Sequence, residues 1–352
     1  MLYLQHTITL GILSLLTWGC GNSDKQKGEA EQAPLADKGW ETNPVIDSDN
    51  PDPTVIKAED GYFYLYATGG NTWIHKSKDL VHWTYVGGAY EDDKKPSWEP
   101  EAGIWAPDIN YINGKYVMYY SLSKWGGGAT CGIGVSVSDK PEGPFTDQGK
   151  LFRSNEIDVH NSIDPFYIED DGKKYLFWGS WYGIWGVELT EDGLGLKGGI
   201  ENATKIQVAA NTGGTNAYEG SYILKRGKYY YLFCSTGTCC DGANSTYQTV
   251  VCRSTELFGP YLNKSGDNMN DNKHEVLIHR NDAFLGTGHN AEIVQDDEGK
   301  DWIIYHAYRT ADPSLGRVVL LDRVYWDDDD WPYLVGDGPV VKAEAPTFKK
   351  SK

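Results

Sequence analysis

One short pattern occurs five times along this chain of 352 residues. An apolar segment leads into a tight turn that contains glycine, and a second segment rich in Tyr and Trp follows. The five copies are NPDPTVIKAEDGYFYLYATG, WAPDINYINGKYVMYYSLS, NSIDPFYIEDDGKKYLFWGS, YEGSYILKRGKYYYLFCST and GHNAEIVQDDEGKDWIIYHAY. Each copy predicts two strands joined by a hairpin. A repeat restricts the possible folds strongly, because each unit must bury its apolar face against its neighbours.

The copies are regularly spaced. Asp52, Asp108, Asp164 and Glu219 open the first four at steps of about 56 residues, and His289 opens the fifth after a longer step, which predicts an inserted loop. A third and a fourth strand are expected in the segments TWIHKSKDLVHWTYVG, GIGVSVSDKPEGPFTDQG, GIWGVELTEDGLGL, TVVCRSTELFGPYLNKSG and GRVVLLDRVYWDDDDWPYL. No long segment has the 3.6-residue period of a helix. Together the units predict an all-β, five-bladed β-propeller over residues 39–345.

The N-terminal segment differs from the rest. Residues 8–18 are apolar but too few to span a bilayer, and they lead into LTWGC, which resembles the lipobox of bacterial lipoproteins. We expect a lipoprotein signal peptide over residues 1–20, a lipid anchor on Cys20 and a flexible tether over residues 21–38. A plain secretion signal is the alternative. The expected location is the bacterial cell envelope, at the outer membrane or cell surface, and otherwise the periplasm or the medium.

The net charge of −18 argues against nucleic acid and anionic membrane surfaces as partners, apart from a membrane contact through the lipid on Cys20. Aromatic residues make up 13% of the chain. They suit the faces of sugars, although most aromatic side chains in a β protein fill its core. We therefore expect a monomer with an uncharged substrate.

Five cysteines remain besides Cys20, namely Cys131, Cys234, Cys239, Cys240 and Cys252. They lack the C-x₂-C spacing of a zinc site. In an oxidising compartment a cross-strand disulfide between Cys234 and Cys252 is expected. The adjacent Cys239 and Cys240 are expected to shape a loop.

The propeller geometry predicts that the acidic residues lie close together at the central channel. The first strand of each blade lines the central channel, so Asp52, Asp164 and Glu219, taken to be at equivalent positions, converge on one axis. Repulsion and burial then separate their pKa values. One protonated and one ionised carboxyl are what hydrolysis of a glycosidic bond requires. A purely structural role is the alternative, since Asp before Pro also begins turns.

From Asn43 to Pro339 the chain resembles glycoside hydrolase family 43, and within it the endo-acting 1,5-α-L-arabinanases. The motifs that carry the resemblance are NPDPTVI, GIWAPDI, NSIDPF, YEGSYI and GHNAEI, with TGTCCDGANSTYQTVVCRST and YWDDDDWPYL as features more specific to arabinanases. The resemblance implies an inverting hydrolase of α-1,5-linked L-arabinan. In it Asp52 is the general base, Glu219 the general acid, and Asp164 the acid that raises the pKa of Glu219 and orients it.

The resemblance also implies a central metal ion near His289, usually calcium, with water as most of its ligands, and no organic cofactor. Trp98 and Trp105 are expected to stack on sugar rings. Further expected substrate contacts are Gly126 in the loop 125–127, Asn161, Ser162, Ile163, Ser180, Trp181 and Tyr182. Two alternatives stay open: an exo-acting α-L-arabinofuranosidase or β-xylosidase of the same family, and a glycan-binding propeller without catalysis.

Overall fold

The computed structural model describes residues 40–210 and 217–349. The expected signal peptide over residues 1–20, with Cys20, and the tether over residues 21–38 lie outside the described residues. Within the described ranges, no helix has both the length and the apolar character needed to cross a membrane.

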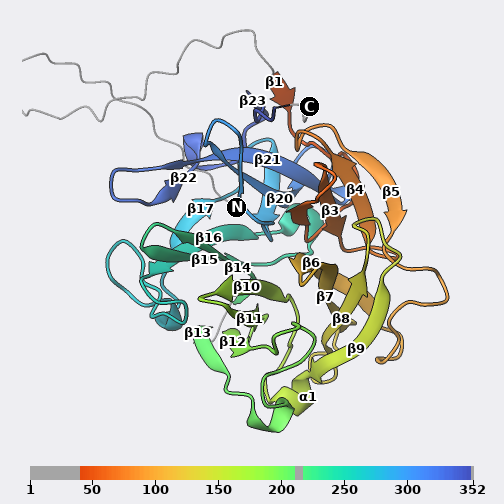
Figure 1. Cartoon of the computed structure of the whole chain (residues 1–352). Coiled ribbons are helices and arrows are strands. Elements are labelled where there is room, and N and C mark those ends of the chain that lie inside the picture. Colours follow the sequence, from red (N-terminus) through yellow and green to blue (C-terminus); the bar gives the residue numbers. More distant parts are fainter. Residues whose placement is uncertain (1–39, 211–216, 350–352) are drawn as a thin grey trace, which may run out of the picture. The chain divides into compact units, whose positions relative to one another are not determined.

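Five antiparallel sheets follow one another along the chain and surround a common centre (Figure 1). Blade 1 contains β2 (Thr54–Lys57), β3 (Phe63–Ala67), β4 (Trp73–Ser77) and β5 (Thr84–Gly88). Blade 2 contains β6 (Gly103–Ile112), β7 (Lys115–Ser123), β8 (Gly132–Ser138) and β9 (Thr146–Arg153). Blade 3 contains β10 (Phe166–Asp170), β11 (Lys173–Trp178), β12 (Ile184–Glu188) and β13 (Ile206–Ala209). Blade 4 contains β14 (Tyr218–Arg226), β15 (Tyr229–Thr236), β16 (Gln248–Ser254) and β17 (Glu275–Ile278).

Blade 5 contains β18 (Phe284–Gly288), β19 (Val294–Gln295), β20 (Asp301–Arg309), β21 (Arg317–Trp326) and β22 (Pro332–Tyr333). The described helices are all short: α1 (Ser154–Ile157), η1 (Ile200–Asn202), η2 (Gly242–Asn244), η3 (Met269–Asp271), η4 (Pro313–Leu315) and η5 (Val335–Asp337). The predicted five-bladed propeller is therefore confirmed, and the chain enters each blade through the strand that lines the channel.

The predicted hairpins form the first two strands of blades 1 to 4, and in blade 5 the predicted hairpin forms β19 and β20, which follow β18. In blade 2, for example, Asn113 and Gly114 take positive φ values of 51° and 80° at the turn between β6 and β7, as a tight hairpin requires. The second strands are buried on both faces, and all five residues of β3 are buried. This burial explains why these strands are continuous aromatic and aliphatic runs instead of alternating ones.

The fourth strands of blades 3 and 4 lie further along the chain than expected. The residues predicted for them form isolated bridges instead, Leu189 with Leu196 in blade 3 and Arg253 with Leu262 in blade 4. The chain pairs again only at β13 and β17. The excursion between β16 and β17 contains η3, and it accounts for the longer step between the fourth and fifth copies of the repeat.

The first and last described strands pair with each other. β1 (Trp40–Thr42) is antiparallel to β23 (Lys342–Glu344), next to blade 5 (Figure 1). The amide of Asn43 donates to the carbonyls of Leu321 and Val340 at 3.0 and 2.9 Å, and accepts from the Leu321 N–H at 2.9 Å. These bonds fasten the segment that leads into blade 1 to the last blade, and so they close the ring.

The expected disulfide between Cys234 and Cys252 is absent, since both are free thiols. Leu232 faces Cys252 and Cys234 faces Val250 in the register of β15 and β16. The two cysteines are therefore diagonal neighbours, and diagonal Cα atoms lie further apart than a disulfide normally allows.

Candidate active site

A residue with left-handed backbone lies within or next to the innermost strand of every blade, near the same end. The φ values are 54° at Asp52, 40° at Ala106, 59° at Asp164, 58° at Gly220 and 49° at His289. Such angles are unfavourable for residues other than glycine and persist only where the surroundings enforce them. In blade 4 the left-handed residue is Gly220, so Glu219 precedes this position by one residue, whereas Asp52 and Asp164 occupy it.

Hydrogen bonds between neighbouring blades hold these residues in place. The Asp52 N–H donates to His306 Nδ1 at 3.0 Å, and the Asp164 N–H donates to Ser121 Oγ at 2.8 Å. The N–H of His289 donates to Ser235 Oγ at 2.7 Å. In each pair the acceptor comes from the second strand of the adjacent blade. The closed ring, and no single repeat, therefore determines the backbone of the site.

Three cationic or imidazole groups surround Asp52. Its Oδ1 lies 3.2 Å from Arg317 Nη1, 3.4 Å from His289 Nδ1 and 3.4 Å from His306 Nδ1. Burial opposes ionisation, but the Arg317 guanidinium and then the two histidines hold the pKa of Asp52 well below its usual range. Burial in turn lowers the pKa values of His289 and His306. Asp52 is thus an ionised carboxylate at neutral pH.

The surroundings of Glu219 and Asp164 raise their pKa values, in contrast to those of Asp52. Ser180 Oγ donates to Glu219 Oε2 at 2.7 Å, and the Gly220 N–H donates to Asp164 Oδ2 at 3.1 Å. Burial raises the pKa of Glu219, and the charge of Asp52 adds to the rise. Burial also raises the pKa of Asp164, with the charge of Glu219 as the next cause. The two carboxyls therefore retain a proton together at a pH at which an isolated carboxyl is ionised.

Several of the expected sugar contacts are exposed aromatic side chains. Trp181 and Tyr182 are 60% and 52% exposed, and the Trp181 N–H donates to the carbonyl of Tyr218, next to Glu219. Trp105 packs against Trp125, which is 79% exposed, with ring centroids 5.5 Å apart. Gly126 follows Trp125 with a φ of 79°. These rings provide flat apolar surfaces on which a sugar can stack.

The other expected contacts belong to the supporting wall. Trp98 donates from Nε1 to the Tyr120 hydroxyl at 3.0 Å, and the Arg153 guanidinium lies over its ring. Ser162 is fully buried and donates to the Val159 carbonyl. Ile163 is buried as well, and Asn161 Nδ2 donates to the Ser180 carbonyl at 3.4 Å. Asn161 thus supports Ser180, which in turn contacts Glu219.

The sequence prediction missed two residues that contact Asp52. His306 lies within β20 and Arg317 begins β21, so neither belongs to an innermost strand. A signal was present, because YHAY and GRVVLL each place one polar residue in an apolar run that is predicted to be buried.

No group of three or more His, Cys, Asp or Glu side chains among the described residues is arranged to hold a metal ion. His289, the expected metal neighbour, instead approaches Asp52 through Nδ1. A calcium ion prefers six to eight oxygen ligands. The protein side chains alone therefore do not fit a calcium site here.

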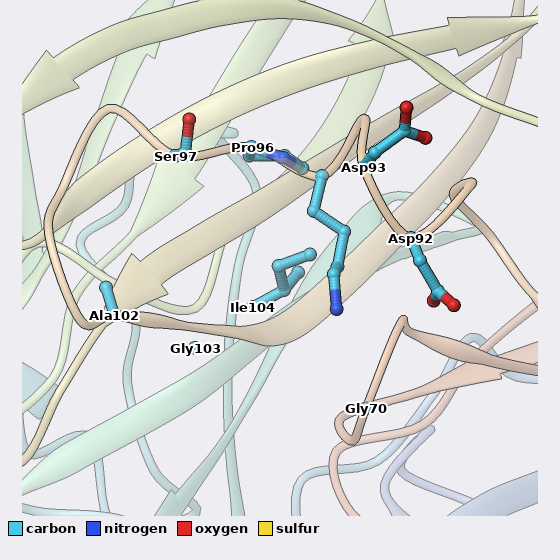
Figure 2. Close-up of a pocket in the computed structure, with 9 residues that line it drawn as sticks. Gly70, Asp92, Asp93, Pro96, Ser97, Ala102, Gly103 and Ile104 are labelled. Atoms are coloured by element: carbon cyan, nitrogen blue, oxygen red, sulfur yellow. The ribbon is translucent and has the colours of Figure 1, made fainter.

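A separate pocket of about 350 Å³ lies beside blades 1 and 2. Figure 2 shows the segment with Asp92, Asp93 and Ser97 arching over Ala102 and Ile104 at the start of β6. The three acids of the channel are not among its lining residues. Its lining combines the charged Asp92, Asp93 and Lys95 with the apolar Ala102 and Ile104, and the pocket is distinct from the carboxylate cluster.

Residues 41–332 match the family described as Glycosyl hydrolases family 43. The chain is 35% identical over 303 residues to an extracellular exo-α-(1→5)-L-arabinofuranosidase, ArbA, of Cellvibrio japonicus, with 80% of this chain and 85% of that protein covered. It is 34% identical over 292 residues to an extracellular endo-α-(1→5)-L-arabinanase of Bacillus subtilis, with 80% and 86% covered. A solved structure of Cellvibrio cellulosa α-L-arabinanase complexed with arabinohexaose superimposes with a TM-score of 0.74 at 33% identity, covering 82% and 96%.

Proposed function

The chain belongs to glycosyl hydrolases family 43, and on that premise we propose that it cleaves α-1,5-linked L-arabinan in the endo mode. Members of this family are glycoside hydrolases that invert the configuration at the anomeric carbon. Relatives named as arabinanases and as an arabinofuranosidase support arabinan as the substrate.

One observation carries the assignment of roles. Asp52 is paired with Arg317 and ionised, whereas Glu219 and Asp164 retain a proton between them. Two carboxyl environments with separated pKa values are what an inverting hydrolase requires, one to accept a proton from water and one to donate a proton to the leaving group.

In the proposed mechanism, Asp52 takes a proton from a water molecule as the water attacks the anomeric carbon. Glu219 donates its proton to the departing glycosidic oxygen, and the Ser180 hydroxyl orients its carboxyl group. Asp164 adds negative charge beside Glu219 and so keeps the pKa of Glu219 high. The side chains of Trp105, Trp181 and Tyr182 hold the sugars on either side of the scissile bond.

We also propose that a calcium ion binds near His289, with few ligands from the protein. Because the described side chains form no three-ligand cluster, water must supply most of the ligands. A cation held there would supply positive charge to the site, and no step of the mechanism depends on it. Removal of calcium with a chelator, followed by measurement of melting temperature and activity, tests whether the ion is present.

The experiment that tests the function compares substrates. We expect release of reducing sugar from linear 1,5-arabinan and none from xylan, and NMR of the first product should find the inverted anomer. Failure to cleave arabinan contradicts the proposal. Rapid loss of viscosity and a ladder of oligosaccharides indicate endo action, whereas a single short product indicates exo action. Exo action remains the second candidate because the relative from Cellvibrio japonicus bears an exo name.

We further propose that the enzyme works outside the cytoplasm on a lipid anchor at Cys20. The extracellular names of two relatives support export, and the LTWGC motif supports the anchor. The wild type should partition with membranes and a Cys20→Ser variant with the soluble fraction. A wild type that is already soluble contradicts the anchor and leaves export as a plain secreted protein.

A further inference from the structure

Two adjacent thiols face the carboxylate cluster and have no part in the mechanism above. Cys239 is partly exposed, Cys240 is exposed, and both are free. They lie in the connection between β15 and β16, whereas the other described cysteines, Cys131, Cys234 and Cys252, are fully buried. Among the described cysteines, a reagent in solution can therefore reach Cys239 and Cys240.

The loop that carries the pair is fixed at its base. The Thr246 N–H donates to the Thr238 carbonyl at 3.2 Å, and the Thr238 N–H donates to Thr246 Oγ1 at 2.9 Å. Ser245 Oγ is shared between the carbonyls of Thr238 and Cys239, at 2.6 and 3.0 Å. The two thiols are therefore presented at a defined place next to the channel.

Arg317 connects this loop to the base. Its Nη1 lies 3.5 Å from Cys239 Sγ and 3.2 Å from Asp52 Oδ1. One guanidinium nitrogen thus divides its contacts between a thiol and the carboxylate that accepts the proton from water. A chemical change at the thiol therefore alters how strongly Arg317 interacts with Asp52.

The two thiols differ in acidity, which favours reaction at one of them. A hydrogen bond from Cys239, followed by the charge of Arg317, lowers the pKa of Cys240. The same hydrogen bond raises the pKa of Cys239 well above its usual value. The thiolate is the nucleophile in thiol chemistry, so Cys240 reacts first.

We propose that Cys239 and Cys240 form a dithiol modification site in the wall of the active site, open to small disulfides and trivalent arsenicals, whose modification reaches Asp52 through Arg317. The proposal rests on the proposed function, because it takes Asp52 as the base. No role in catalysis is assigned to either thiol.

The chemistry of the site balances with a small disulfide as the oxidant. The Cys240 thiolate attacks one sulfur of the reagent, so the reagent S–S bond breaks, a mixed disulfide forms and one reagent thiolate leaves. Cys239, after losing its proton, attacks the Cys240 sulfur and expels the second reagent thiolate. Two cysteine thiols are oxidised, one reagent disulfide is reduced to two thiols, and the two cysteine protons pass to these products.

The expected effect on catalysis follows from Arg317. Closure of the dithiol removes the Cys240 thiolate, whose negative charge interacts with Arg317, so the guanidinium pairs more fully with Asp52 afterwards. A more strongly paired carboxylate is a weaker base, and we expect kcat on arabinan to fall on the order of three- to tenfold. Reduction with dithiothreitol should restore it.

The test treats the native protein with oxidised glutathione and follows free thiols, peptide masses and kcat together. We expect two thiols to be lost, one peptide to contain the new Cys239–Cys240 bond, and kcat to fall reversibly. Cys240→Ser should lose the response of kcat. Cys239→Ser should stop at a mixed disulfide with glutathione on Cys240 and form no internal bond, whereas Cys234→Ala, which changes a buried thiol, should keep the full response. Phenylarsine oxide, which bridges two thiols with release of water, should bind the wild type and neither serine variant.

Three results overturn the proposal. The first is that the pair reacts with neither reagent. The second is that the disulfide forms and kcat is unchanged. The third is that Cys240→Ser responds as the wild type does. Thiol counts and peptide masses do not depend on turnover. Failure to cleave arabinan with normal closure of the dithiol therefore refutes the proposed function and leaves the modification site in place.

Discussion

Two levels of the central channel contain buried carboxyl groups from different blades. The catalytic level, named for the roles proposed above, holds Asp52, Asp164 and Glu219. The lower level lies further along the same innermost strands and holds Asp108 and Glu292. Asp108 is buried like the three acids of the catalytic level, and Glu292 is partly buried. In both levels burial raises the pKa of at least one carboxyl group.

The hydrogen-bond partners distinguish the levels. Glu292 accepts from the Val55 N–H at 2.7 Å and from Thr54 Oγ1 at 2.9 Å, which joins blade 5 to blade 1. Asp108 accepts from the Tyr167 N–H at 2.9 Å, which joins blade 2 to blade 3. These oxygens satisfy strand ends and so hold blades together. At the catalytic level Asp52 faces an arginine and two imidazoles instead.

The comparison teaches that a buried acid with a raised pKa is no sufficient mark of catalysis. What matters is which partners surround the carboxyl groups. N–H groups of neighbouring blades bind Asp108 and Glu292, whereas the other level combines one backbone bond, to Asp164, with an arginine, two imidazoles and the Ser180 hydroxyl. Asp108 and Glu292 are structural by this criterion, and the catalytic level is where charge is arranged for chemistry. The following predictions set one level against the other.

The largest effect is expected for Glu219→Gln, which removes the proton donor and keeps the shape of the side chain. Hydrolysis of arabinan should fall by about 10²- to 10⁴-fold, whereas an aryl arabinofuranoside with a good leaving group should lose much less, since it needs little protonation. Glu292→Gln makes the same change at the lower level and should keep most of the activity. Equal losses on both substrates argue against Glu219 as the acid.

Asp52→Gly should lose activity to a similar degree, because water is no longer activated. The space left by the side chain admits azide, which attacks the anomeric carbon without a base, so added azide should restore bond cleavage and yield a glycosyl azide. Asp164→Asn is the matched control, and azide should not rescue it. Rescue of both variants to the same extent removes the distinction between base and modulator.

Glu292→Ala should affect stability more than chemistry. It leaves the Val55 N–H without its acceptor, and a buried unsatisfied group costs about 1–3 kcal/mol. Thermal or urea unfolding should find this loss, and Glu219→Ala should cost less because its partner is the rotatable Ser180 hydroxyl. A larger loss for Glu219→Ala contradicts the division between the two levels.

The smallest effect concerns pH. Glu219 must be protonated to act, so the high-pH limb of the rate profile follows its pKa. Asp164→Asn removes a neighbouring negative charge, and the limb should move to lower pH by on the order of one unit. Asp108→Asn should leave the limb where it is. An unmoved limb in Asp164→Asn means that Asp164 does not tune the acid.

Much of the fold follows from local pattern. Apolar segments, hairpin turns and a regular step predict strands and their repetition, because these signals act within a few residues. The step from Glu219 to His289 predicts an insertion, and Asp330 takes a φ of 62°, in agreement with the tolerance of Asp for left-handed backbone. The fourth strands of blades 3 and 4 were misplaced because their pairing depends on longer connections.

The carboxylates of the site were visible in the sequence because the repeat itself marks the innermost strands. Their environment was not, since Arg317 and His306 come from other strands and meet Asp52 only when blade 5 closes on blade 1. The contact of blade 4 with blade 5 sets Cys239 beside Arg317, and the register of β15 and β16 keeps Cys234 apart from Cys252. Sequence thus determined which acids share an axis, and tertiary structure decided their protonation, because pKa values depend on neighbours brought together by the ring.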